Sequence, residues 1–287
     1  MSVVIGVGAG LVLVVALIRI FENRFIFFPP RYPEGFASPQ NYGLQVEEVW
    51  MTAEDGVRLN AWYLPNPASP KVLLVFHGNA ENIGYGLGRL KAFARLGTNV
   101  LAVDYRGYGK SEGSPDEAGV YRDAEAAYRY LVDARHYSPK NIFVYGQSLG
   151  SAVAIDLASR HECGGLIVES SFTSAREVAR RSFRIPGFEF VPKSRFDSLA
   201  KITRVRAPIL IVHGAQDQLF PVSMGQSLYQ AAPGPKSFLL LDGAGHDDIF
   251  LVGGERYFAH LSMLMGVTSA VPAVGATPQK GHEHEIR

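Results

Sequence analysis

One short segment constrains the fold of this chain more than any other: Gly146–Gly150, with the sequence GQSLG. The residues before it, 141–145, form an apolar run of strand length, and apolar residues recur at helical spacing over 151–160. A strand, the pattern G-x-S-x-G and a helix are together typical of a sharp turn that exposes a serine hydroxyl. Side chains at 146 and 150 would clash in so tight a turn, so both positions require glycine.

The central serine of this turn, Ser148, is the candidate nucleophile. The helix that follows it directs its N-terminus toward the serine, where it favours developing negative charge. The alternative interpretation is an ordinary N-cap serine in a glycine-rich turn. Because a strand and a helix flank the motif as a nucleophile elbow requires, the catalytic interpretation is favoured.

A serine nucleophile needs a base, and the base needs an acid that orients it. Asp217 follows the apolar strand 207–213, and His246 follows the strand 236–241 after a glycine-rich loop. Catalytic groups of open α/β sheets gather at the carboxyl ends of the strands. The chain order of serine, aspartate and histidine matches that of G-x-S-x-G hydrolases. Glu169, at the end of another strand, is the alternative acid, and a turn-capping role is the alternative for Asp217.

Two backbone N–H groups are expected to bind the oxyanion of a tetrahedral intermediate. One belongs to Leu149, directly after the serine, and the other to Asn79, with Ala80 as the near alternative. His77 is expected to be hydrogen-bonded within the same loop. Asp104 and Arg106, in the loop after another strand, are expected to pair beneath the site.

The order of elements predicts an α/β fold with a mostly parallel central sheet and helices on both faces. Residues 170–206 interrupt the alternation and are interpreted as a short cap insertion. We expect the hydrolase domain to span 29–266 and the tail 267–287 to be disordered. Strands are expected at 46–52, 57–64, 71–77, 99–104, 141–145, 165–169, 207–213 and 236–241, and helices at 84–96, 114–134, 151–161 and 247–265.

Composition limits the other classes of function. The net charge of +1 gives no general attraction to nucleic acid, and a single cysteine, Cys163, excludes an intrachain disulfide. His282 and His284 lie in the tail and lack the spacing of a metal-binding helix. Neither a cofactor nor a metal is expected.

The N-terminus is apolar. Residues 3–21 contain one charge, Arg19, and as a helix they would extend about 28 Å, close to the thickness of a bilayer core. They predict a transmembrane anchor within residues 1–28. A signal peptide is the alternative, but no small-residue cleavage site follows. Arg19, Arg24 and Arg31 predict a single-pass membrane protein with its catalytic domain in the cytoplasm.

With these motifs the chain resembles the α/β-hydrolase superfamily, and within it the membrane-anchored serine hydrolases that include eukaryotic protein depalmitoylases. The resemblance covers residues of about 45–262. The matching segments are FHGNAEN at 76–82, DYRGYGKSEG at 104–113, YGQSLG at 145–150, HGAQD at 213–217 and GH at 245–246. It implies Ser148, Asp217 and His246 as the catalytic triad.

The predicted function is hydrolysis of carboxylic ester or thioester bonds through an acyl-enzyme, on acyl or lipid-like substrates. The alternative is a peptidase or amidase with the same triad. The insertion 170–206 is rich in phenylalanine and carries nine Lys or Arg against three acids. Its aromatic side chains either line an acyl slot or complete the hydrophobic core, and the sequence leaves both interpretations open.

Overall fold

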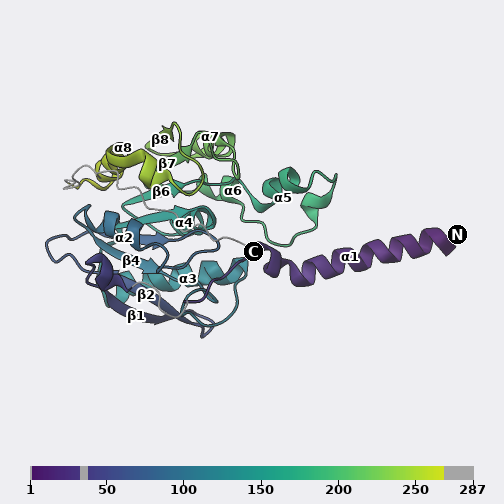
Figure 1. Cartoon of the computed structure of the whole chain (residues 1–287), viewed down its shortest axis with the longest axis horizontal. Helices are drawn as coiled ribbons and strands as arrows, with labels where there is room; N and C mark the ends of the chain where they lie inside the picture. The colour runs from purple at the N-terminus through teal and green to yellow at the C-terminus, as the bar shows by residue number, and fades with distance from the viewer. Residues whose placement is uncertain (1, 33–37, 268–287) are drawn as a thin grey trace, which may run out of the picture.

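The computed structural model describes residues 2–32 and 38–267, with side chains from residue 13 onward. Its centre is an eight-stranded sheet in the order β1-β2-β4-β3-β5-β6-β7-β8 (Figure 1). β1 and β2 form an antiparallel hairpin, β2 pairs antiparallel with β4, and all the remaining pairs are parallel. The mostly parallel sheet expected from the sequence is therefore confirmed.

The elements follow the predicted alternation closely. The strands are β1 Glu47–Thr52, β2 Arg58–Leu64, β3 Val72–Phe76, β4 Asn99–Val103, β5 Ile142–Gln147, β6 Gly165–Glu169, β7 Ile209–Gly214 and β8 Lys236–Leu241. The α-helices are α1 Ser2–Ile26, α2 Leu87–Ala94, α3 Glu117–Arg129, α4 Leu149–Arg160, α5 Ala175–Phe183, α6 Ser198–Ile202, α7 Val222–Ala231 and α8 Ile249–Met265. Short helical turns are η1 Pro39–Tyr42, the π-type η2 Tyr130–Ala134, η3 Pro139–Asn141 and η4 Phe188–Phe190.

Helices cover both faces of the sheet, and each face has its own core. On one face α3, α4 and α7 pack on the strands, and α6 packs on α4 and α7; on the other face lie α2 and α8 (Figure 1). The central strands β3, β4, β5 and β6 are buried along their whole length. Strands buried on both faces read as continuous apolar runs, which is why the sequence located them well.

The turn between β5 and α4 is as tight as the sequence implied. Ser148 has φ 53° and ψ −117°, a backbone conformation that is costly for a residue with a side chain. A Cβ atom on Gly146 would lie 2.1 Å from the Gly150 carbonyl oxygen, and one on Gly150 would lie 2.2 Å from that of Phe76. The steric requirement for glycine at both positions is confirmed.

The start of α3 differs from the prediction. For the helix expected at 114–134 the pattern Ser114-Pro115 predicts an N-cap at Ser114, but the cap is Asp116, whose carboxylate accepts a hydrogen bond from the Gly119 N–H at 2.6 Å. Both residues are good N-caps by type. Asp116, which directly precedes the first helical turn, makes the bond, so the helix begins two residues later than expected.

Within the insertion, 170–206, lie the short helices α5, η4 and α6. Phe172 and Phe196 are buried and belong to the core, so for these two side chains the core-completing interpretation holds. Phe183 and Phe190 are exposed. Glu117 accepts hydrogen bonds from the backbone N–H groups of residues 195 and 196 at 2.6 and 2.7 Å, which fixes the insertion to the start of α3.

The expected membrane anchor is contradicted. Within the described residues, no helix is at once long enough and apolar enough to cross a membrane. The predicted transmembrane helix over residues 3–21, and the single-pass membrane localisation that rested on it, are therefore wrong. The segment is helical, but α1 continues to Ile26 through Arg19, Glu22 and Arg24.

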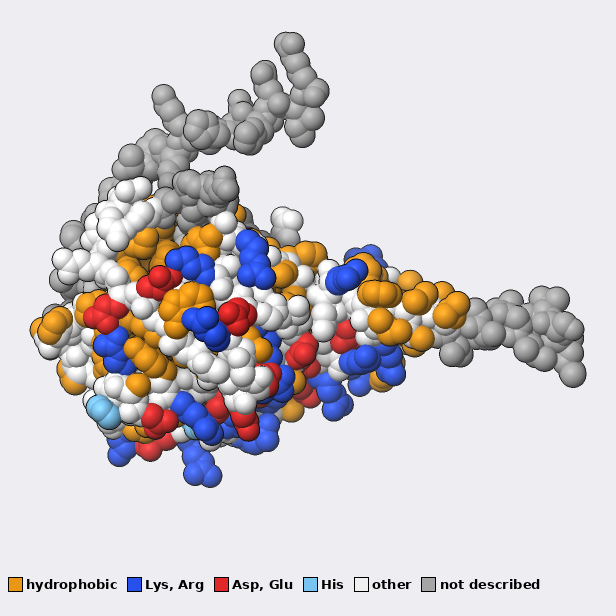
Figure 2. Space-filling model, turned by 90° about the horizontal axis from the view of Figure 1, so that it is seen from below, with side chains coloured by type: hydrophobic (Ala, Val, Ile, Leu, Met, Phe, Trp, Pro, Cys, Tyr) orange, Lys and Arg blue, Asp and Glu red, His pale blue; other side chains and the backbone are white. Residues whose placement is uncertain are grey.

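The charged end of α1 packs on protein. The Arg19 Nε donates to the Val191 carbonyl oxygen at 2.8 Å, and Glu22 is buried against the insertion. In Figure 2 hydrophobic side chains lie along the helix where it projects from the body. An apolar run in the sequence does not reveal which contacts the helix end will make. The predicted tail, 267–287, falls outside the described residues except for Val267.

The steric account of the elbow predicts the effect of Gly150→Ala. Its Cβ would meet two backbone oxygens of β3 and the following loop, those of Phe76 and His77. Neither can move without distorting the sheet, so we expect a loss of about 1–3 kcal/mol or more in the free energy of unfolding, measured by urea denaturation. Gly88→Ala in α2 is the matched control, because nothing lies within 4 Å of its Cβ. This control should stabilise by about 0.5–1 kcal/mol. Equal effects of the two substitutions would contradict the steric account.

Candidate active site

The fold brings together the three side chains that the sequence singled out. Ser148 lies at the end of β5, Asp217 in the loop after β7, and His246 in the loop after β8. The His246 Nε2 atom is 3.0 Å from the Ser148 Oγ atom, and its Nδ1 atom is 2.8 Å from the Asp217 Oδ2 atom. These are hydrogen-bond distances in the arrangement that nucleophile, base and orienting acid require.

The carboxylate of Asp217 determines which nitrogen of His246 carries a proton. Burial alone would raise the pKa of Asp217, but hydrogen bonds from His246 and from the Phe220 N–H outweigh it, and the pKa is lowered. The carboxylate therefore stays ionised and can only accept hydrogen bonds. Nδ1 of the imidazole must donate to it, which leaves Nε2 of the neutral ring free to accept the Ser148 proton.

A second carboxylate oxygen fixes the position of Asp217. Its Oδ1 atom accepts from the backbone N–H groups of Leu219 and Phe220 at 2.9 and 2.8 Å. These bonds form an Asx turn, so the turn-capping role that was the alternative for Asp217 coexists with the bond to His246. The His213 Nε2 atom lies 3.5 Å from the Asp217 carboxylate and donates to the Phe220 carbonyl oxygen, 2.8 Å away. Burial lowers the pKa of His213, which favours its neutral form.

His246 is also held by a residue that the sequence analysis did not identify. The Ser170 hydroxyl donates to the His246 carbonyl oxygen at 2.8 Å, and Ser170 itself has φ 46°. The ring of Phe220 packs edge-on against the imidazole, with centroids 5.1 Å apart. The position of Ser170, directly after the strand that ends at Glu169, was the signal that could have identified it.

The alternative acid, Glu169, lies elsewhere. Its side chain is fully buried and accepts a hydrogen bond from the Tyr257 hydroxyl at 2.7 Å. Burial raises the pKa of Glu169, opposed by the nearby guanidinium of Arg89. Its backbone carbonyl oxygen accepts from the Ser148 N–H at 3.0 Å. Glu169 thus supports the elbow from beneath, and it is Asp217 that contacts His246.

The predicted oxyanion donors are the backbone N–H groups of Leu149 and Asn79. Leu149 is the first residue of α4, where a helix offers no acceptor for the N–H. The other loop also comes close, since a Cβ on Gly78 would lie 3.6 Å from the Ser148 Cβ. Within the described part of the chain the Asn79 N–H donates to no protein acceptor. Ala80 follows it with φ 59°, which makes the turn sharp.

The surrounding polar side chains pair differently from the prediction. His77 bonds within its loop as expected, with Nδ1 2.7 Å from the Gly78 carbonyl oxygen. Asp104 and Arg106 do not pair with each other. Asp104 accepts from the Ile83 N–H at 2.8 Å, whereas Arg106 forms ion pairs with Asp55 and Asp123. Positions two residues apart in the loop direct these two side chains to different elements.

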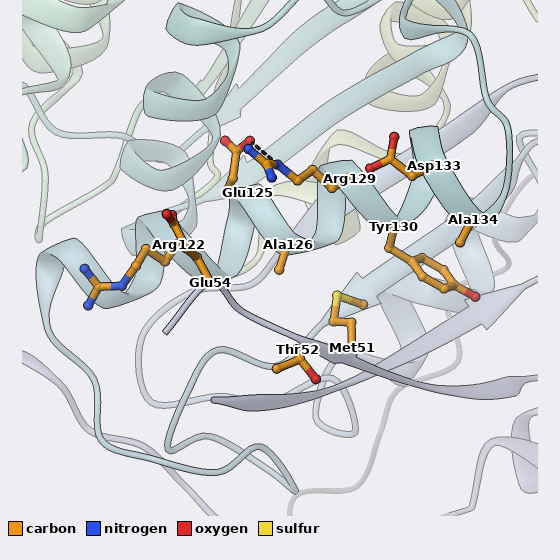
Figure 3. Close-up of a pocket in the computed structure, with 10 residues that line it drawn as sticks. All are labelled: Met51, Thr52, Glu54, Arg122, Glu125, Ala126, Arg129, Tyr130, Asp133 and Ala134. Atoms are coloured by element: carbon orange, nitrogen blue, oxygen red, sulfur yellow. Dashed lines mark hydrogen bonds and ion pairs between the residues drawn. The ribbon is translucent and has the colours of Figure 1, made fainter. Parts of the chain in front are cut away.

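Two hollows of the surface lie away from Ser148, Asp217 and His246. One, of about 370 Å³, lies between β1 and α3 and is lined by residues such as Met51, Arg122 and Tyr130 (Figure 3). The other, of about 450 Å³, lies between α1, the start of α3 and the insertion. Among the described residues no group of three or more His, Cys, Asp or Glu is placed to hold a metal ion.

Comparison with known proteins identifies the family. A protein of Xenopus laevis described as alpha/beta hydrolase domain-containing protein 17C is 38% identical over 259 residues, which cover 82% of this chain and 78% of that protein. The chain belongs to the α/β-hydrolase family. The superfamily resemblance drawn from the sequence is confirmed, and the chain is a serine hydrolase. An uncharacterized protein of Mycobacterium tuberculosis is 34% identical and covers 84% of this chain and 86% of its own length.

Two further comparisons agree with this assignment. A family model described as serine aminopeptidase, S33, matches residues 67–191. The solved structure of the Pyrococcus furiosus esterase Pf2001 superposes with a TM-score of 0.71 at 26% identity, covering 83% of this chain and 98% of that one.

The lowered pKa of Asp217 predicts a pH-dependent contribution to stability. A carboxyl whose pKa is lower in the folded state stabilises the fold above its unfolded value, near 3.9, and loses this effect as the pH falls. The difference in unfolding free energy between wild type and Asp217→Asn should therefore be largest near neutrality and shrink below about pH 4. Urea denaturation from pH 2.5 to 7 measures it. A difference independent of pH would show that the charge of Asp217 does not stabilise the fold.

Proposed function

We propose that the chain is a serine ester hydrolase in which Ser148 is the nucleophile, His246 the general base and acid, and Asp217 the residue that orients the imidazole. The observation that carries the proposal is the continuous hydrogen-bond path from the Ser148 Oγ through His246 to Asp217, with distances of 3.0 and 2.8 Å. The strained elbow at Ser148 supports it, because it holds the hydroxyl apart from the helix that follows.

The proposed reaction proceeds in two halves. The Ser148 Oγ attacks the acyl carbon while the His246 Nε2 takes its proton, and the carbonyl oxygen becomes an oxyanion. The N–H groups of Leu149 and Asn79 bind this oxyanion. The C–O bond to the leaving group then breaks, and the imidazolium returns the proton to the departing oxygen. Water attacks the acyl-enzyme by the same route, which releases the acid and restores Ser148.

The surface around the loops that carry the proposed site residues favours a substrate with an apolar acyl group. Exposed apolar side chains occur on three segments that carry or contact a proposed site residue. Leu219 lies two residues after Asp217, Leu251 lies five residues after His246, and the Phe28 N–H bonds the Asn79 side chain. Exposed apolar residues on several converging loops are typical of sites that bind apolar ligands. The similar Pyrococcus furiosus protein is described as an esterase, which supports an ester substrate.

Amide hydrolysis is the second candidate, because the matching family model is described as serine aminopeptidase. An amide nitrogen is a poorer leaving group than an ester oxygen, so its departure depends more on proton transfer from His246. The same three side chains would serve both reactions. Substrate tests therefore decide between them.

Two substitutions test the residue roles. Ser148→Ala removes the attacking atom and should abolish ester turnover above background. Asp217→Asn keeps the shape but loses the acceptor that fixes the imidazole, and kcat should fall by about 10³- to 10⁴-fold. Hydrolysis of p-nitrophenyl butyrate measures both, and Asp242→Asn, an exposed aspartate after β8, is the matched control. Retention of more than a tenth of wild-type kcat by either site variant would sink the assignment.

Chain-length dependence tests the substrate class. We expect kcat/KM to rise from acetyl to octanoyl esters, because each buried methylene contributes about 0.8 kcal/mol at most. The series is measured with oxygen esters and thioesters, and with alanyl and leucyl anilides as amide substrates. Turnover of anilides alone would replace the ester proposal with the peptidase candidate. Equal rates for acetyl and octanoyl esters would contradict the apolar acyl site.

A further inference from the structure

The chain segment that follows α1 reaches the loop of the proposed oxyanion donor. The Asn79 Oδ1 atom accepts from the Phe28 N–H at 3.1 Å and from the Tyr108 hydroxyl at 2.6 Å, and its Nδ2 atom donates to the Ile26 carbonyl oxygen at 2.6 Å. Three bonds thus fix a side chain whose own backbone N–H is the proposed donor. Two of the partners are separated from Asn79 by more than fifty residues of sequence.

The same segment is itself held in place. Glu22 is buried and accepts hydrogen bonds from the Lys193 and Ser194 N–H groups at 2.6 and 3.0 Å and from the Ser194 hydroxyl at 2.8 Å. Phe27 is 2% exposed and packs edge-on against Phe196, with centroids 6.0 Å apart. The insertion therefore holds the segment on one side, and Asn79 contacts it on the other.

Farther along, the segment continues to follow the loops of the site. The Pro30 carbonyl oxygen accepts from the Gly109 N–H at 3.0 Å, and Arg31 donates to the Ser111 carbonyl oxygen at 3.1 Å. Residues 22–31 are thus bonded to the insertion, to the loop at 77–82 and to the loop at 104–113. A donor that binds an oxyanion must be held in position before the reaction, since small displacements reduce catalysis steeply.

We propose that Asn79 is a positioning residue whose side chain, held by the backbone of residues 26–28 and by Tyr108, places its own backbone N–H to receive the oxyanion. The N-terminal segment thereby becomes part of the catalytic apparatus. This inference rests on the proposed function. It gives the end of α1 a role in turnover, which the segment performs through its hydrogen bonds to Asn79.

The test uses the full chain with Asn79→Ala, which removes all three side-chain bonds and keeps the backbone N–H. We expect kcat to fall about 10- to 100-fold with KM within twofold, because loss of an oxyanion donor costs about 10²- to 10³-fold and a displaced donor less. Affinity for an alkylboronic acid, which forms a tetrahedral adduct with a serine, should fall by the same factor. Affinity for a non-hydrolysable ether analogue of the substrate should not change.

Further variants separate positioning from folding. Asn79→Asp keeps the acceptor for Phe28 and Tyr108 and should lose less kcat than Asn79→Ala, and Tyr108→Phe, which removes one bond, should lose least. Asn66→Ala is the matched control. Among the residues that the structure describes, its Oδ1 accepts only from the Ala68 N–H, in the loop before β3 at the opposite end of the strand. If Asn79→Ala does not fold, Asn79→Asp and Tyr108→Phe decide the question with the same two ligands.

Either of two outcomes would overturn the inference. The first is a kcat of Asn79→Ala within twofold of wild type, and the second is an equal loss of affinity for the boronic acid and for the ether analogue. Ser148→Ala distinguishes the two proposals. If it is inactive while Asn79→Ala is unimpaired, only the positioning role fails; if Ser148→Ala retains activity, the proposed function fails as well.

Discussion

The contact between the start of α4 and the end of β3 is the constraint on which the rest of the site depends. The backbone at Gly150 lies so close to the carbonyl oxygen of Phe76 that no side chain fits between them. This approach forces Ser148 into a strained conformation at the carboxyl edge of the sheet. It also brings the loop after β3 close to the serine at Gly78, the residue before Asn79. One steric requirement thus sets the position of the proposed nucleophile and of the loop that carries the proposed oxyanion donor.

The other two side chains of the site also follow strands that end at this edge of the sheet. β7 and β8 end at the same edge as β5, and the loops that follow them deliver Asp217 and His246. Backbone donors fix one oxygen of Asp217, so the other is left for the imidazole. Rigid strands with polar loops allow the three groups to meet at hydrogen-bond distance although they are far apart in the sequence.

The sequence predicted what local patterns encode. Apolar runs located the buried strands, and the short motifs that end them identified Ser148, Asp217 and His246, which the structure brings together. It did not predict contacts that depend on how distant segments meet. The bonds of Asn79 to residues 26–28, and that of Ser170 to His246, join segments more than fifty residues apart. The membrane anchor was wrong because an apolar count ignores the charged end of α1, which packs on the insertion.

The central claim is that an acyl group passes through Ser148, and direct detection of the acyl-enzyme tests it most directly. Acid quenching during turnover of p-nitrophenyl octanoate, followed by trypsin digestion and mass spectrometry, locates the adduct. The account predicts an octanoyl group on the tryptic peptide 141–160, assigned by fragmentation to Ser148. The peptide should stay unmodified in Ser148→Ala. An adduct at another residue would contradict the account. So would turnover that leaves no adduct at any quench time, under conditions in which deacylation limits the rate.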